Sequence, residues 1–204
     1  VENAIRQLNY QPDRLAARRG TAGDIYVFKC TAAAADQGLT FDEVVRVGER
    51  VNAQTRSLGV ALAAAASIET GQPMFDLPLG SLEIGMGLHG EMGVSRTDFE
   101  SAESLVPKMI DLLLADYQAT KTPLNRVAVM INALGGTTVL ELLAVAGHVR
   151  RTLEVKGLRI DRFEAGEFAT SLDMAGFSIT MLPLDEEIGP LFEAGCDSVC
   201  YTRA

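Results

Sequence analysis

A short apolar run, Val127–Ile131, is followed closely by a glycine pair and then by a helix-start signal. The run is typical of a strand that is buried on both faces. Gly135 and Gly136 predict a turn, and Thr138 with Glu141 three residues later has the pattern of a capping box. A buried strand that turns directly into a helix restricts the chain to the α/β or α+β class.

Helical patterns also occur on both sides of this unit. The further helical segments are residues 24–37, 41–57, 105–117 and a short one that starts at Asp185. A second capping box, Thr40 with Glu43, marks the start of the second of these. The third has Ser104 as its predicted N-cap and places Pro107 in the first turn, where proline is tolerated. The helix that follows Thr138 should end near Gly157.

Two more strands are expected towards the C-terminus. One is the short segment Ile160–Phe163, and the other covers residues 177–181. Apolar and polar residues alternate in the second, which predicts a half-buried strand with Ser178 and Thr180 on the polar side.

Glycine and proline interrupt regular structure in the middle of the chain, at Gly71, Pro73 and Pro78. We therefore divide the chain there. Residues 1–75 are predicted to belong to a first structural part and residues 76–204 to a second, α/β part.

Composition excludes several classes of protein. A net charge of −9 argues against a nucleic-acid-binding surface, which needs clustered basic residues. No apolar run reaches the roughly 18 residues that cross a bilayer. The three cysteines, Cys30, Cys196 and Cys200, form no paired CxxC motif. Neither a disulfide framework nor a metal site is predicted, and a reducing cytoplasm is the expected location.

The segment with the most unusual pattern is 82–91. It is predicted to be one strand, in which Leu82, Ile84, Met86 and Leu88 form an apolar face. The other face would carry Gly85, Gly87 and His89 between Glu83 and Glu91. Glycine in a strand usually marks the close approach of another group. Gly85 and Gly87 would therefore leave an open groove on this face, with the imidazole at its end. The pattern alone fits a structural histidine or a glycine bulge as well as a ligand-binding histidine.

Four blocks of sequence resemble one family in the same order. They are ARRGTAG (17–23), EIGMGLHGEMGV (83–94), NALGGTT (132–138) and TSLDMAGFSIT (170–180). These blocks are similar to motifs of the substrate-binding subunit of dihydroxyacetone (glycerone) kinases. The similarity extends from about Ala17 to Leu184 and identifies the chain with the C-terminal portion of that subunit.

This resemblance implies a fold, a function and a site. The fold would be an α/β domain with a sheet covered by helices, preceded by the helical tail of the first domain. His89 would bind the carbonyl of dihydroxyacetone covalently as a hemiaminal, with Gly87 and Gly90 lining the substrate site. The bound ketose would then be phosphorylated by a partner subunit that carries ATP and Mg²⁺ or a phosphorylated carrier. No cofactor is expected in this chain itself, and family members are homodimers. The alternatives are an erythrulose kinase and a non-enzymatic, ketone-sensing co-regulator.

The chain also departs from the family pattern. Neither the GGGSGHEP loop nor the NYxGD segment of the family's N-terminal half occurs in these residues. That half, which supplies the acid–base histidine and aspartate, is expected to lie elsewhere, as a separate chain or a lost segment. Met92 replaces the usual proline, and residues 67–73 differ from the usual loop. Both changes affect the expected substrate preference.

Three other candidates have less support. His148 should point away from an apolar helix face formed by Leu142, Leu143, Ala146, Val149 and Leu153. Asp173 is expected to cap or stabilise a turn. The loop 132–138 lacks the established phosphate-binding patterns, so a structural turn is the preferred interpretation.

Overall fold

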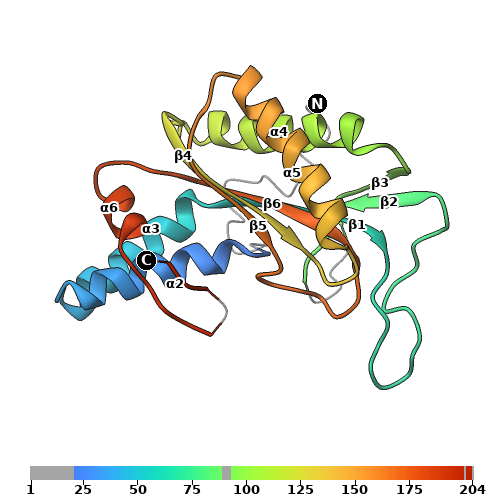
Figure 1. Ribbon diagram of the computed structural model, residues 1–204, viewed down its shortest axis with the longest axis horizontal. Coiled ribbons are helices and arrows are strands. Elements are labelled where there is room, and N and C mark those ends of the chain that lie inside the picture. The colour runs from blue at the N-terminus through green and yellow to red at the C-terminus, as the bar shows by residue number, and fades with distance from the viewer. Residues whose placement is uncertain (1–20, 89–92, 200, 204) are drawn as a thin grey trace.

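The computed structural model describes residues 21–88, 93–199 and 201–203 (Figure 1). Within these residues six strands form one sheet in the order β3-β2-β1-β6-β4-β5. The strands are β1 (Arg56–Ala63), β2 (Ser81–Ile84), β3 (Ser95–Asp98), β4 (Arg126–Ala133), β5 (Arg159–Gly166) and β6 (Ala175–Pro183). β4 and β5 run parallel, and the other neighbouring pairs run antiparallel.

Helices cover both faces of the sheet (Figure 1). The helices are α2 (Gly23–Asp36), α3 (Phe41–Gln54), α4 (Ala102–Ala119), α5 (Val139–Val155) and α6 (Ile188–Glu193). α4 and α5 pack on one face, against Val60, Val129 and Ile179 among others. α2, α3 and α6 pack with Ala128 and Met130 on the other. The predicted α/β architecture, a sheet covered by helices, is confirmed.

Local signals placed several elements correctly. Both predicted capping boxes are present, Thr40 with Glu43 at α3 and Thr138 with Glu141 at α5. β4 is buried along seven of its eight residues, as its unbroken apolar run predicts. The chain leaves α5 through Gly157, whose φ of +77° suits glycine.

The predicted half-buried character of β6 is wrong. Ser178 and Thr180 are both 0% exposed, because helices cover this face of the sheet as well. Each hydroxyl has a partner, as buried polar groups require. Thr180 Oγ1 lies 2.7 Å from Ser57 Oγ, and Ser178 Oγ accepts a hydrogen bond of 3.4 Å from the side-chain amide of Asn132.

The central strand β1 was missed, and the helix expected to reach Ser57 ends at Gln54. The sequence of β1 is RSLGVALA, in which alanine and glycine have low strand propensity. Its strand conformation depends on two neighbours, since β1 pairs with β2 and with β6. The edge strand β3 also had no prediction.

The predicted start of the third helix is wrong as well. α4 begins at Ala102, with Ser101 as its N-cap, and Ser101 Oγ accepts from the backbone N–H of Ser104. Pro107 therefore lies in the second turn and removes the N–H that would bond to the carbonyl of Glu103. Glu103 is exposed, so water can satisfy that carbonyl.

The division at residue 75 stays a prediction. β1 precedes that point, and the strands paired with it follow it. Within the described residues, both sides of the predicted boundary therefore contribute to the same sheet.

Candidate functional site

The block 132–138 interlocks with the block 170–180 at the carboxyl end of β4. The backbone N–H of Gly136 donates to Met174 O at 2.8 Å, and that of Ser171 donates to Leu134 O at 2.8 Å. A Cβ atom on Gly135 would lie 1.8 Å from the carbonyl oxygen of Leu172. Glycine at 135 is therefore required for the two loops to touch.

Polar side chains hold these loops from both sides. Asn132 is fully buried and accepts from the backbone N–H groups of Phe168 and Ala169 at 2.8 and 2.9 Å. Thr137 Oγ1 donates to Gly176 O at 2.7 Å and accepts from Gly176 N at 2.8 Å. These contacts give the loop 132–138 a structural role, as the sequence favoured.

The described part of the histidine-bearing block crosses over the sheet. β2 ends at Ile84, because Gly85 adopts a φ of +85° and donates its N–H to Gly59 O at 2.7 Å. Leu82 and Ile84 pack beneath α4 and α5, whereas Met86 packs on the opposite face. The prediction of one continuous strand over 82–91 with a single apolar face is therefore wrong.

Met86 is 1% exposed and packs with Ala61, Ala65, Leu134 and Met174. We call these five residues the loop junction. Residues of the junction come from β1 and the loop after it, from the histidine-bearing block and from both interlocking loops. Three of the four family blocks therefore meet there.

The other end of the histidine-bearing block is also anchored. The Glu83 carboxylate, 6% exposed, accepts from Gly93 N at 2.6 Å and pairs with Arg96 at 3.0 Å. The N–H of Val94 donates to Ile84 O at 2.8 Å. Fixed contacts therefore lie on both sides of residues 89–92, at the loop junction and at Glu83.

Of the three predicted site residues, the structure describes Gly87. His89 and Gly90 lie outside the described residues. Gly87 is buried, directly after Met86. The substrate-binding roles of all three remain predictions.

The described end of the first block, Thr21 to Gly23, lies over β1. A Cβ atom on Gly23 would be 3.1 Å from Ser57 Oγ. A Cβ atom on Gly59 would lie 3.6 Å from Thr21 Cγ2 and 3.0 Å from Met86 O. The first and second blocks therefore meet above Gly59, and sequence reasoning missed this role of β1 because β1 itself carried no strand signal.

The remaining candidates have structural or surface positions. Asp173 was expected to have a buried capping or turn role, but it is exposed. Its Oδ1 accepts from the backbone N–H of Ala66 at 2.7 Å, a contact that joins two distant segments of the chain. His148 is half-buried and lies 3.2 Å from a guanidinium nitrogen of Arg151. Leu143, expected on the buried face of the same helix, is 55% exposed. Burial raises the pKa of the Cys30 thiol to about 12, with a smaller opposing effect of Lys29, so this thiol stays protonated.

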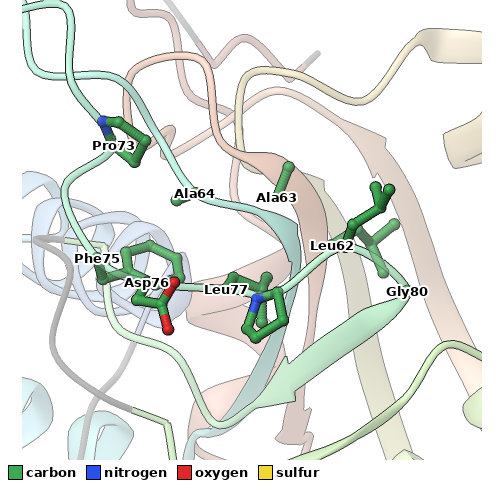
Figure 2. A pocket seen from close by; sticks show the side chains of 10 residues that line it. Leu62, Ala63, Ala64, Pro73, Phe75, Asp76, Leu77 and Gly80 are labelled. Atoms are coloured by element: carbon green, nitrogen blue, oxygen red, sulfur yellow. The ribbon is translucent and has the colours of Figure 1, made fainter.

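A separate hollow lies beside the long connection between β1 and β2 (Figure 2). Its volume is about 560 Å³, and its lining includes Leu62, Pro73, Phe75 and Leu77. Asp76 is the one charged residue of its lining, and the side chain of Asp76 is 91% exposed. The hollow offers little chemistry, so we take the loop junction and the block it supports as the candidate site.

The described residues offer neither a metal site nor a membrane-spanning helix. No group of three or more histidine, cysteine or acidic side chains among them could hold a metal ion. None of the described helices is long and apolar enough to span a membrane.

Comparison with known proteins identifies the family. A family model described as "Dak1 domain" matches residues 8–200. The chain belongs to the Dak1 domain family. The resemblance of the four blocks to dihydroxyacetone kinase substrate-binding subunits is thereby confirmed.

Three relatives illustrate the range of Dak1 proteins. A D-erythrulose kinase from Mycolicibacterium smegmatis is 44% identical, over 92% of this chain and 32% of the relative. The dihydroxyacetone-binding subunit of a PTS-dependent dihydroxyacetone kinase from Listeria innocua is 39% identical, over 93% of this chain and 56% of the relative. A solved dihydroxyacetone kinase operon co-activator has a TM-score of 0.79 at 29% identity, over 86% of this chain and 54% of that one. The chain thus spans from 32% to 56% of the length of these relatives.

Proposed function

We propose that this Dak1 chain binds dihydroxyacetone, or a similar short ketose, through His89 and holds it for phosphorylation. The observation that carries the proposal is the support of the histidine-bearing block. Met86 packs on residues of two other family blocks, and Gly93 is held by Glu83. A segment anchored on both sides is suited to hold a reactive side chain in a fixed geometry.

The chemistry of the proposed step requires no leaving group. The free ring nitrogen of a neutral imidazole adds to the ketone carbon, and a carbon–nitrogen bond forms as the carbonyl π bond breaks. The carbonyl oxygen takes up a proton, and the other ring nitrogen gives one up to solvent. Glycerol has no carbonyl group and cannot form this hemiaminal, so covalent capture would separate two molecules of similar shape.

The phosphate donor is proposed to come from a partner. The sequence holds no recognisable nucleotide-cradling loop, so ATP with Mg²⁺ or a phosphorylated carrier would be brought by another subunit. We also propose that the protein is a homodimer in the cytoplasm. The acid–base groups would be supplied by an N-terminal half, which lies on this or on another polypeptide.

Two alternatives have specific support. The 44% identity to a D-erythrulose kinase favours a four-carbon ketose as a competing substrate. The TM-score of 0.79 to an operon co-activator favours a ketone-sensing role without catalysis. Competition between erythrulose and dihydroxyacetone for the same adduct tests the first. Ketone capture without phosphate transfer, in the presence of a donor subunit, would indicate the second.

Native mass spectrometry of the protein with dihydroxyacetone tests the central proposal. We expect the mass of one ketose to be added in the wild type and in His148→Ala, which serves as the matched control. His89→Ala should show no addition, and an adduct retained in that variant would overturn the proposal. Only the neutral imidazole reacts, so affinity should fall about tenfold for each pH unit below the pKa of that imidazole.

A further inference from the structure

The solvent side of α5 carries a patch of large apolar side chains. Val139 is 68% exposed, Leu140 is 80% exposed and Leu143 is 55% exposed. Positions three and four residues apart are neighbours on a helix, so these side chains form one continuous surface. The opposite side of α5 packs on the sheet and on α4, so the patch faces away from the core (Figure 1). Single exposed apolar residues are ordinary, but a continuous apolar surface marks an interaction site.

A glycine lies on the same side of the helix. Gly147 follows Leu143 by one turn, in the middle of α5, where glycine destabilises a helix relative to alanine. Outside the helix backbone, the nearest described group to a Cβ atom on Gly147 would be Arg151 Nη1, at an ordinary contact distance of 3.7 Å. The fold of the described residues therefore does not require glycine here. A glycine of this kind indicates that another molecule approaches the helix closely at this point.

The charged residues of α5 are distributed unevenly along the helix. Glu141 lies in the first turn, whereas Arg150 and Arg151 lie beyond the glycine. Arg150 pairs with Glu154 at 3.0 Å. The guanidinium of Arg151 contacts the ring of His148 and, within the described residues, meets no carboxylate. One end of α5 thus presents large apolar groups and an acid, and the other presents a small residue and an arginine without an acidic partner in this part of the chain.

We propose that this side of α5 is the contact surface between two copies of the chain, packed antiparallel about a two-fold axis near the middle of the helix. The inference rests on the homodimer of the proposed function. A two-fold contact uses the same surface twice, so that surface must be complementary to itself. Antiparallel packing places Leu143 against Gly147 of the partner subunit, where the missing side chain leaves room. It also brings Glu141 towards Arg151 of the partner subunit, whereas parallel packing would place the two arginines together.

Analytical ultracentrifugation of the protein over a range of concentrations tests the contact. The wild type should dimerise, and Leu143→Lys, which places a charge in the apolar surface, should stay monomeric. Gly147→Ala adds a methyl group at the closest approach of the two helices and should weaken dimerisation about tenfold. Phe41→Lys is the matched control and should dimerise like the wild type. Phe41 is an 80% exposed apolar residue, but it lies in α3, on the opposite face of the sheet.

A second measurement separates the contact from a role of the glycine in folding. In the monomeric Leu143→Lys background, Gly147→Ala should raise the melting temperature, because alanine is the better helix former. Damage to the fold cannot explain a substitution that weakens dimerisation and yet stabilises the monomer. A lower melting temperature in that background would show that the glycine serves the helix itself, and it would overturn the inference.

The outcomes also separate this inference from the proposed function. If Leu143→Lys dimerises as well as the wild type, the dimer uses another surface and only the role of α5 is overturned. If the wild type stays monomeric at every concentration, the contact and the proposed homodimer both fail, whereas ketose capture, measured by mass, is unaffected. If a Dak1 N-terminal half binds the wild type but not Leu143→Lys, that half covers α5 and the inference is overturned.

Discussion

At the residue scale, glycines control how closely the loops of the candidate site approach one another. Gly135 has a φ of +123°, and Gly176 a φ of +155° with Val60 O only 2.1 Å from where its Cβ atom would be. Both lie in blocks that identified the family. Their presence there follows from backbone contacts between loops, since a side chain at either position would displace main-chain atoms.

Gly135→Ala should therefore destabilise the protein by more than about 3 kcal/mol, because backbone strain and a clash with Leu172 O add together. Gly157→Ala is the matched control. Gly157 also has a positive φ of +77°, but nothing lies within 4 Å of an added Cβ atom. That variant should lose only about 1–2 kcal/mol. Urea unfolding measures both, and equal losses would contradict the role assigned to the loop contact.

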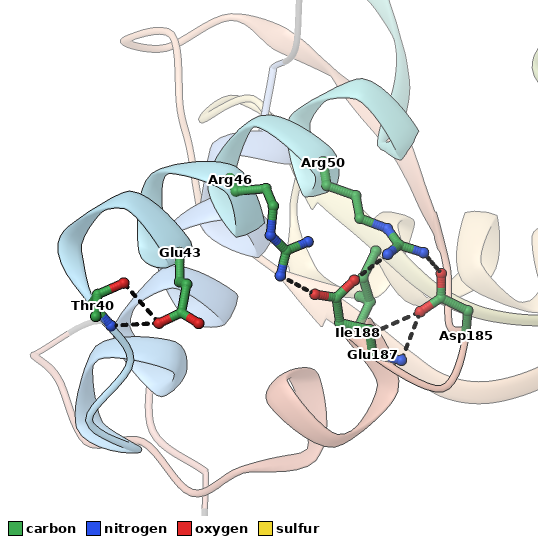
Figure 3. Close-up of polar contacts among 7 residues, drawn as sticks. All are labelled: Thr40, Glu43, Arg46, Arg50, Asp185, Glu187 and Ile188. Atoms are coloured by element: carbon green, nitrogen blue, oxygen red, sulfur yellow. Dashed lines mark hydrogen bonds and ion pairs between the residues drawn. The ribbon is translucent and has the colours of Figure 1, made fainter.

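At the scale of elements, a charge network joins α3 to the turn between β6 and α6 (Figure 3). Arg46 pairs with Glu187, and Arg50 pairs with both Glu187 and Asp185. Asp185 Oδ1 also accepts from the backbone N–H groups of Glu187 and Ile188 at 3.0 and 2.8 Å. Asp185, predicted to start the last helix, thus forms the turn before it.

The pKa values of both carboxyl groups are lowered in the folded protein. Burial acts to raise the pKa of Asp185, but the N–H groups of Ile188 and Glu187 together with Arg50 outweigh it. The hydrogen bond from Arg46 is the largest cause for Glu187. A lowered folded pKa stabilises the protein above the unfolded value of about 4, and this contribution is lost as pH falls through the folded pKa.

Asp185→Asn should lower the free energy of unfolding at pH 7 by about 1 kcal/mol, since the network is partly exposed. The variant should also show a smaller loss of stability between about pH 5 and pH 3 than the wild type. Glu186→Gln, in the same turn but exposed, is the control and should follow the wild-type curve. Unfolding in urea across this pH range measures the difference. Identical curves for Asp185→Asn and wild type would exclude a stabilising role for the network.

At the scale of the whole molecule, the sheet ties distant parts of the chain together. β1 lies between β2 and β6, although more than a hundred residues separate β1 from β6 in the sequence. Arg56, at the start of β1, forms an ion pair with Asp116 of α4, and only 8% of the Arg56 side chain is exposed. The order of the sheet therefore depends on contacts that cross residue 75.

A fragment of residues 76–204 is expected to lack a cooperative unfolding transition. Removal of β1 leaves β6 without one of its two partner strands. It also removes Val60 from the core beneath α4 and α5, so the core residues around Val60 become exposed to solvent. The control is the 204-residue chain, which should unfold cooperatively. Circular dichroism during urea titration measures both. A cooperative transition in the fragment would support the predicted boundary at residue 75.

The isolated chain is expected to form no dihydroxyacetone phosphate from ATP and Mg²⁺. The sequence has no recognisable nucleotide-binding loop, and the family's acid–base motifs are not found in these residues. Turnover should appear when a Dak1 N-terminal half and a donor subunit are added, measured as phosphorylated product. Product formed by the 204 residues alone would mean that a nucleotide site lies in this chain.

The sequence by itself determined the family, the class of fold and the elements with local signals. Such signals are the buried run of β4, the glycine turn after it and the capping boxes at Thr40 and Thr138. Each of them is contained in a few consecutive residues. Signals of this kind can be read along the chain because the interacting groups are neighbours in sequence. The position of His89 in a recognisable block has the same origin.

Only the tertiary structure decided which surfaces are buried and which loops meet. β1 has weak strand propensity and forms because β2 and β6 supply its hydrogen bonds. Ser178 and Thr180 alternate like solvent-facing residues and are buried because helices cover the second face of the sheet. Thr21 and Met86 both lie against Gly59, although they are 38 and 27 residues away from it in the sequence. Such contacts follow from the packing of the whole chain, and no local pattern encodes them.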